Sequence, residues 1–267
     1  MCGICGFNWD DKQLLKSMMD SITHRGPDGS GSYTSRGISL GNRRLSIIDL
    51  KTGKQPIYNE DKSMCIVFVG ELYNYKDLRQ ELEKKNHEFC TSSDTEVVLH
   101  AYEEYGENCL NQFNGMWAIA IWDNKKKELF LSVDRLGIKQ LYYTAVKGKF
   151  LFASEIKAIL QFEDVAREID KKALLEYLTF RYTPTEQTIF KGIKKLLPGH
   201  YLVLSRDKIK IKKYWDIESQ NIENEPLQYH SERILELLKD SVKKRLMSEV
   251  PIGAHLSGGL DSSIVVA

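Results

Sequence analysis

Two cysteines stand at the start of the chain, in the sequence MCGICG, and the first directly follows the initiator methionine. Once Met1 is removed, Cys2 carries a free α-amino group beside its thiol, and the usual pKa of such an amine, about 7.7–8.0, suits a general base near neutral pH. Cys2 and Cys5 also form a C-x-x-C pattern. The sequence holds no second such pattern or Cys/His cluster to complete a zinc site, and a redox pair prefers the start of a helix. A nucleophile and ordinary burial therefore stay open as interpretations of Cys2.

A second candidate for chemistry is LSGGLDSS at 256–263, a Gly/Ser-rich turn between a short apolar stretch and a helix start. Backbone N–H groups of such a turn, with the N-terminus of the helix, can bind a phosphate. No lysine follows the glycines, which excludes a Walker A loop. The alternative is an ordinary tight turn in which Asp261 or Ser262 caps the helix. The preceding stretch, PIGAHL at 251–256, predicts a short strand.

Several charged residues could serve a site but also have structural explanations. Arg44 could be a solvated surface cation, and Glu71 a charge at the end of a strand. Ser93 and Glu96 have the spacing of a capping box, which gives the carboxylates around Asp94 a structural role. Taken singly, these residues do not indicate a function.

The composition favours small-molecule chemistry. Lys and Arg number 38 against 37 Asp and Glu, so a net charge of +1 provides no field for nucleic acid or an anionic membrane. No stretch approaches the roughly 18 apolar residues of a membrane span, and the N-terminus lacks the pattern of a signal peptide. Five cysteines at irregular positions do not predict a disulfide framework. We therefore expect a cytoplasmic protein with reduced thiols.

The elements that must position these residues follow from periodicity and turn signals. Helical spacing is found at 12–23, 75–86, 94–105, 154–162, 171–180 and 227–246, and β-rich stretches at 37–50, 64–75, 115–134, 140–154 and 199–215. Lys147-Gly148 predicts a hairpin turn. The pattern indicates antiparallel strands with helices on their outer faces. We expect an α+β domain at 1–208, a linker at 209–226 and the start of an α/β domain at 227–267.

Taken in order, MCGICG, HRGPD, RLSIID, GELYN, SSDTEV, DRLGIK, FASEIKAI, LPGHY and SGGLDSS resemble the glutamine-dependent asparagine synthetase family over essentially the whole chain. The resemblance implies a class II glutamine amidotransferase (glutaminase) domain with an N-terminal nucleophile, an α+β four-layer α/β/β/α sandwich. It implies that the truncated start of an α/β ATP pyrophosphatase domain follows.

The resemblance also implies roles for single residues in glutamine hydrolysis. Cys2 would attack the side-chain amide of glutamine, release ammonia and form a γ-glutamyl thioester, and the backbone N–H of Gly70 would bind the oxyanion. Arg44 would bind the α-carboxylate, and Glu71 and Asp94 the α-ammonium. The remaining glutamine-binding residues would be Leu45, Ser46, Ile47, Ile48 and Val69.

In the second unit, the implied ligand is ATP, with Mg²⁺ on its phosphates. The implied ATP-binding residues are Leu256, Ser257, Gly258, Gly259, Asp261, Ser262 and Ser263. The parent protein would use the ammonia to amidate aspartate that ATP has activated as β-aspartyl-AMP, and could form a homodimer. This chain alone would hydrolyse glutamine only, and that step needs no cofactor.

Several positions depart from the family pattern. The family has Asn-Gly-Glu where this chain has Val69-Gly70-Glu71, and that Asn side chain is the other oxyanion donor. Loss of one such donor typically costs about 10²- to 10³-fold in rate. Further departures are Val133, Gln140, Arg181 and His255. The alternatives are therefore a synthetase that prefers free ammonia, with a glutamine-binding or structural amidotransferase domain, and a relative that acts on another carboxylate.

Overall fold

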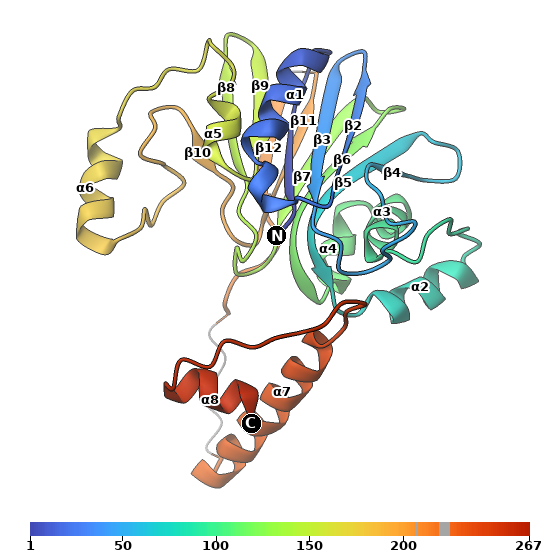
Figure 1. Ribbon diagram of the computed structural model, residues 1–267, viewed down its shortest axis with the longest axis vertical. Helices are drawn as coiled ribbons and strands as arrows, with labels where there is room; N and C mark the ends of the chain where they lie inside the picture. The colour runs from blue at the N-terminus through green and yellow to red at the C-terminus, as the bar shows by residue number, and fades with distance from the viewer. Residues whose placement is uncertain (207, 219–224) are drawn as a thin grey trace.

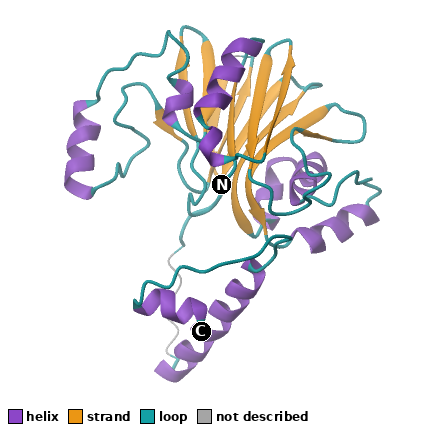
Figure 2. Ribbon diagram, in the orientation of Figure 1, coloured by secondary structure: helices purple, strands orange, loops and turns teal. Residues whose placement is uncertain are grey.

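Two antiparallel β-sheets face each other in the computed structural model, which describes residues 1–206, 208–218 and 225–267 (Figures 1 and 2). The strand order of the first sheet is β10 (Lys194–Lys195), β8 (Tyr142–Val146), β9 (Lys149–Ala153), β1 (Gly3–Phe7), β3 (Ile38–Arg44), β2 (Gly29–Ser35). The order of the second is β12 (Lys208–Lys213), β11 (His200–Ser205), β7 (Glu128–Val133), β6 (Gly115–Asp123), β5 (Met64–Leu72), β4 (Ile57–Tyr58).

Helices cover the outer face of each sheet. The first sheet packs against α1 (Lys12–Ser21) and α5 (Ile156–Ile159), and the second against α2 (Tyr75–Lys84), α3 (Asp94–Tyr105) and α4 (Cys109–Gln112). Short 3₁₀ turns η1 (Thr23–Arg25) and η2 (Gly106–Asn108) and helix α6 (Lys171–Phe180) complete this part. The four layers confirm the predicted α/β/β/α sandwich.

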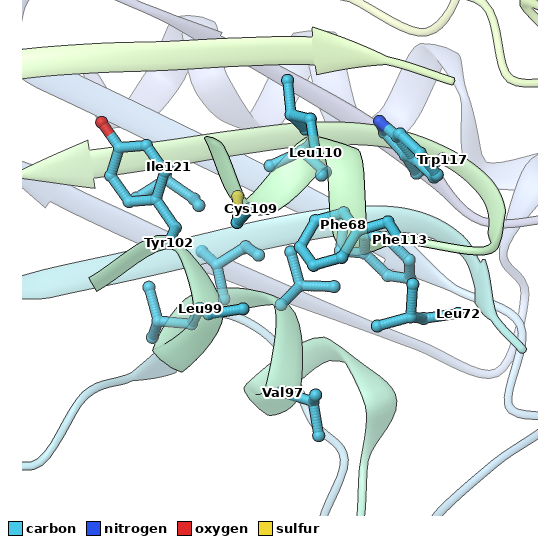
Figure 3. Close-up of a cluster of buried hydrophobic side chains, with 14 of the residues drawn as sticks. Phe68, Leu72, Val97, Leu99, Tyr102, Cys109, Leu110, Phe113, Trp117 and Ile121 are labelled. Atoms are coloured by element: carbon cyan, nitrogen blue, oxygen red, sulfur yellow. The ribbon is translucent and has the colours of Figure 1, made fainter. Parts of the chain in front are cut away.

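Three hydrophobic cores separate the four layers, and β5 contributes to two of them. Val67 and Val69 point between the sheets, where they pack with residues such as Leu131 of β7. Phe68 and Leu72 point the other way, into the core that α3 and α4 cover (Figure 3). Because side chains alternate along a strand, Glu71 shares the inner side of β5 with Val69.

A second unit follows the sandwich and contacts it at the loop after β3 and at Tyr73, whose ring lies 4.7 Å from the Arg245 guanidinium. It contains α7 (Leu227–Arg245) and α8 (Leu260–Val266), which Figure 1 shows set apart from the sheets. The carboxylate of Glu249 accepts hydrogen bonds from the backbone N–H groups of Asp49 (2.8 Å) and Leu50 (3.3 Å), and its own N–H donates to Ile47 O (3.0 Å). No helix in the ranges the structure describes is long and apolar enough to cross a membrane.

Most predicted elements are confirmed. Helix α3 has the predicted bounds, and Lys147 and Gly148 both have positive φ, as a tight hairpin turn requires. Strand β12 pairs with β11 along its length, so the second sheet extends to Lys213, inside the expected linker. Residues 219–224 of that linker lie outside the described residues.

Three local predictions are wrong. Residues 251–256 form no strand, because that segment has no neighbouring strand to pair with in the described part of the chain. The β-rich stretch at 37–50 forms β3 only as far as Arg44 and continues as a loop. The capping box is not formed: Ser93 accepts from Thr95 N, whereas Glu96 turns away to accept from the N–H groups of Cys90 and Thr91.

Candidate active site

Cys2 lies at the end of the central strand of the first sheet. It immediately precedes β1, which pairs with β3 on one side and β9 on the other. Arg25 Nε donates to Cys2 O at 2.8 Å, and Glu155 holds the Arg25 guanidinium at 3.2 Å. The Cys2 thiol accepts from Leu45 N at 3.2 Å and donates to Leu45 O at 3.4 Å. The thiol is thereby fixed against the loop that follows β3.

The chemistry of Cys2 requires a base. Burial raises the pKa of the Cys2 thiol, and the hydrogen bond from Leu45 only partly opposes this, so the thiol is protonated at neutral pH. Burial also lowers the pKa of the Met1 amino group. A lowered pKa of this kind at the α-amino group of Cys2 itself, once Met1 is removed, would suit proton transfer from the thiol.

Cys5 lies on the opposite face of β1 from Cys2. It is 0% exposed and packs with Leu15 and Met18 of α1, whereas Cys2 packs against the core between the sheets. Burial raises the pKa of Cys5 to about 12. The two thiols therefore form neither a metal site nor a redox pair, and Cys5 is a packing residue.

A pocket brings together nearly all the residues predicted for glutamine. It is lined by Cys2, Arg44, Leu45, Ile47, Ile48, Gly70, Glu71 and Asp94, together with Gly53, Gln55, Phe68, Ser93 and Thr95. Ser46 and Val69 do not line it: the N–H of Ser46 donates to the Asp28 carboxylate at 2.9 Å, and Val69 lines a neighbouring cavity. Cys2 precedes β1, and the other residues come from β3, β5, the start of α3 and the loop after β3, so the fold assembles the pocket from segments far apart in sequence.

Arg44 is buried in the wall of this pocket. Its Nη2 donates to Ile48 O at 2.9 Å and to Asp49 O at 2.7 Å, so the loop wraps around the guanidinium. A Cβ at Gly53 would stand 2.6 Å from Nη2, and the site therefore needs a glycine there. The planar cation is held in one place, as recognition of a carboxylate requires.

Glu71 and Asp94 form a carboxylate pair across the pocket. Asp94 is the first residue of α3 and accepts from Leu72 N at 2.9 Å. Burial and the charge of Asp94 raise the pKa of Glu71 to about 8. Burial raises the pKa of Asp94 to about 6 against the opposing backbone hydrogen bonds from Leu72 and Thr95. A buried and a half-buried carboxylate, both with raised pKa values, are arranged to receive a cation.

Gly70 and Val69 lie beside the thiol on β5. Gly70 has φ +153°, and a Cβ there would stand 2.0 Å from Met116 O, so only glycine fits. The Val69 side chain is 2% exposed and cannot donate a hydrogen bond. Asn74 cannot replace the missing donor, because its Nδ2 donates to Gln112 O and its Oδ1 accepts from Asn114 N, both at 2.9 Å.

Two polar residues at the site were missed by the sequence analysis. Lys139 is 7% exposed, and its Nζ lies 3.3 Å from Met1 Sδ. Burial lowers the pKa of Lys139, and the charge of Glu71 opposes that lowering. Gln55 accepts from Phe68 N at 2.7 Å and donates to Thr95 Oγ1 at 3.3 Å, which ties β5 to α3. The only sequence signal for Lys139 was its place in DRLGIK.

A cavity of about 550 Å³ adjoins the pocket and shares Cys2, Gly70 and Glu71 with it. Val69 and Lys139 also line it, together with Arg245, Met247, Ser248 and residues 250–253 of the second unit. Cys2 therefore stands at the junction of a narrow polar pocket and a wider cavity that reaches the second unit.

The other departures from the family pattern affect the site less. Val133 is part of the core between the sheets, whereas Gln140 and His255 are exposed. Arg181 follows α6 with φ +64°, the left-handed conformation that a glycine adopts without strain.

The residues predicted for ATP lie in the second unit, away from this pocket. They occupy the exposed segment before α8 and its first turn. The hydroxyls of Ser257 and Ser262 are 2.9 Å apart, those of Ser262 and Ser263 donate to Gly259 O, and Gly258 has φ +80°.

Comparisons with known protein families match both units of the chain. The family described as glutamine amidotransferase domain matches residues 1–215, and that described as asparagine synthase matches residues 233–267. Asparagine synthetase [glutamine-hydrolyzing] 3 of Bacillus subtilis is 40% identical over 100% of this chain and 45% of its own length. Amidase chyE of Penicillium rubens is 38% identical over 94% of this chain and 37% of its own length. The chain spans about half the length of the synthetases it matches.

Solved structures show the same fold. The allosteric regulatory enzyme of purine biosynthesis aligns with a TM-score of 0.60 at 20% identity, covering 83% of this chain and 50% of its own. Glutamine phosphoribosylpyrophosphate amidotransferase from B. subtilis aligns with a TM-score of 0.57 at 20% identity over the same shares. These likenesses extend the agreement from sequence to the sandwich architecture.

Proposed function

We propose, since the chain belongs to the glutamine amidotransferase domain family, that Cys2 hydrolyses glutamine after removal of Met1. The thiol loses its proton to the α-amino group of Cys2 and attacks the side-chain amide carbon of glutamine. The C–N bond breaks, ammonia leaves with the transferred proton, and water then hydrolyses the γ-glutamyl thioester to glutamate. The observation that carries this proposal is the thiol at the edge of a pocket with a buried guanidinium and a carboxylate pair.

The two ends of a free amino acid match the charges of the pocket. Arg44 binds the α-carboxylate, and Glu71 with Asp94 binds the α-ammonium, which leaves the side-chain amide directed at the thiol. The backbone of Leu45–Ile48 forms the wall between, since Leu45 already contacts the sulfur. A neutral ligand or one of reversed polarity would leave these buried charges uncompensated.

Transition-state stabilisation rests on one donor fewer than the family pattern provides. Gly70 N–H is the donor we assign to the oxyanion, and Val69 supplies none. We expect the rate of glutamine hydrolysis to be about 10²- to 10³-fold lower than at a site with both donors.

We extend the proposal to a longer parent protein that makes asparagine. Its amidotransferase unit, expected at 1–208 and extended to Lys213 by β12, would be joined by the rest of the expected linker (209–226) to a synthetase unit that begins at 227, where aspartate is activated by ATP with Mg²⁺. The exposed hydroxyls and N–H groups of 256–263 fit a phosphate by donor type. Ammonia would leave Cys2 through the cavity that reaches the second unit. A homodimer and a cytoplasmic location stay predictions.

A second candidate function follows from Val69. A site with one oxyanion donor suits a synthetase that uses free ammonia and keeps this domain to bind glutamine or to support the fold. A relative that amidates another carboxylate is the further alternative.

Substitution of the nucleophile tests the proposal. Cys2→Ala should abolish glutamate release from glutamine, whereas the control Cys90→Ala, at an exposed free thiol, should hydrolyse at the parent rate. Mass measurement of the unsubstituted chain should show the loss of Met1. A Cys2→Ala chain that hydrolyses glutamine at the parent rate would exclude the proposal.

A further inference from the structure

Four side chains on the outer helical layer converge at a place that glutamine hydrolysis does not use. Glu60 comes from the turn between β4 and β5, His87 from the segment after α2, and His100 and Glu103 from α3. One ligand atom from each lies within 4.8 Å of all the others. The cluster lies about 9–14 Å along α3 from its first residue, Asp94.

Several distances between these side chains are close to the ligand–ligand separation around one small ion. Nδ1 of His87 lies 3.2 Å from Glu60 Oε1 and 4.0 Å from Glu103 Oε2. Nδ1 of His100 lies 3.5 Å from both Glu60 Oε2 and Glu103 Oε2. Nitrogen and oxygen ligands about 2.0–2.2 Å from a tetrahedral Zn²⁺ are separated by about 3.4 Å.

Buried polar atoms without a hydrogen bond at the same place are a second indication of a ligand. His100 is 0% exposed, and neither of its ring nitrogens makes a hydrogen bond of normal geometry among the described residues, although carboxylate oxygens of Glu60, Glu103 and Glu96 lie 3.5–3.8 Å away. Glu103 Oε2 is also buried without such a partner there, although Glu103 Oε1 accepts from Asn59 Nδ2 at 2.8 Å. Buried polar atoms are rarely left unpaired, because each one costs about 1–3 kcal/mol.

Outer carboxylates face the far nitrogen of each imidazole. His100 Nε2 lies 3.8 Å from Glu96 Oε1, and His87 Nε2 lies 3.5 Å from Glu104 Oε2. Glu96 is itself fixed by the hydrogen bonds from Cys90 N and Thr91 N. A carboxylate behind a metal-binding histidine orients the ring and fixes its tautomer.

We propose that Glu60, His87, His100 and Glu103 bind one divalent transition-metal ion, and that Zn²⁺ fits the site best. Two imidazole nitrogens and two carboxylate oxygens are ligands that Zn²⁺ accepts, and the two carboxylates balance its charge. All four protein ligands are present, which is typical of a structural site. The ion would join the β4–β5 turn and the segment after α2 to α3, the helix that carries Asp94 into the glutamine pocket.

Metal titration of the 267-residue chain tests this site. After EDTA treatment and removal of the chelator, calorimetry should show one Zn²⁺ per chain, and Co²⁺ should give the visible absorption of a tetrahedral complex. Glu60→Gln and His87→Gln should each weaken binding by at least about 100-fold. The matched control Glu88→Gln changes an exposed neighbouring carboxylate and should bind as the parent does.

Two further variants separate this site from the thiols. Cys2→Ala and Cys90→Ala remove the thiols that are not fully buried, and neither should affect Zn²⁺ binding. If His100 is simply protonated between the carboxylates, no stoichiometric Zn²⁺ binding will be seen. That result overturns the proposal. Equal affinity in the parent and in a folded Glu60→Gln chain, or binding lost with Cys2→Ala, overturns it as well. Zn²⁺ should also raise the melting temperature of the parent and leave that of Glu60→Gln unchanged.

Discussion

The Glu71–Asp94 pair predicts that glutamine binds with release of protons. In the free chain, burial and the charge of Asp94 hold the pKa of Glu71 at about 8, and burial holds the pKa of Asp94 at about 6. An α-ammonium between the two carboxylates favours their ionised forms and lowers both pKa values. The free chain therefore holds more protons than the complex, so the affinity for glutamine rises with pH.

The size of the effect follows from these two values. With an apparent pKa of about 8, Glu71 is ionised in about one chain in ten at pH 7 and in about half at pH 8. Including the smaller contribution of Asp94, the dissociation constant for glutamine should fall about sixfold from pH 7 to pH 8, or about 1 kcal/mol. Between pH 6 and pH 7, where both groups titrate, it should fall about 17-fold.

Calorimetry on a Cys2→Ala chain measures binding without hydrolysis. Titrations at pH 6, 7 and 8 give the slope, and buffers of different ionisation enthalpy give the number of protons released. Glu71→Gln should bind more weakly at pH 8 and lose the slope between pH 7 and pH 8, whereas Glu163→Gln, at an exposed position, should keep it. A dissociation constant that does not change from pH 7 to pH 8, or a slope retained in Glu71→Gln, would refute the reasoning.

Three further predictions follow from the same strand. Val69→Asn should raise kcat for glutamine hydrolysis by about 10²-fold and lower stability by about 1–3 kcal/mol, because it adds an oxyanion donor and buries an amide; an unchanged kcat would contradict the oxyanion argument. Gly70→Ala should lower the melting temperature, because its Cβ would stand 2.0 Å from Met116 O; an unchanged melting curve would show that the strand adapts. In the folded chain the pKa of Glu71 is raised from the usual 4.5 to about 8. The melting temperature of the ligand-free chain should therefore fall as the pH rises from about 4.5 to about 8. Glu71→Gln should flatten that fall, and a parent curve that is already flat would contradict the assignment.

Local sequence signals predicted the elements that local forces determine. The apolar spacing of 94–105 gave the bounds of α3, and Lys147-Gly148 gave the turn between β8 and β9. The ordered motifs also named Cys2, Arg44, Glu71 and Asp94 as one site. That grouping came from resemblance, because no local pattern relates residues whose distances depend on sheet pairing.

The predictions that failed concern groups whose partners lie far away in sequence. The apolar run after Arg44 leaves the sheet because carbonyl groups of that loop are needed by the guanidinium. Glu96 does not cap α3 as expected and instead accepts hydrogen bonds from the N–H groups of Cys90 and Thr91. Lys139 could not be assigned to the site, since its neighbours are the N-terminus and a strand about 70 residues away.

The loop after β3 is held from two directions, by Arg44 on the glutamine side and by Glu249 from the second unit. Two ligands that order the same segment are thermodynamically coupled, and the coupling is equal in both directions. If bound glutamine orders this loop, it must also strengthen the hydrogen bonds between the loop and Glu249. A docked second unit must in turn raise the affinity of the pocket for glutamine. The strength of communication between the two halves can then be measured as one ratio, the affinity for glutamine with and without the Glu249 carboxylate.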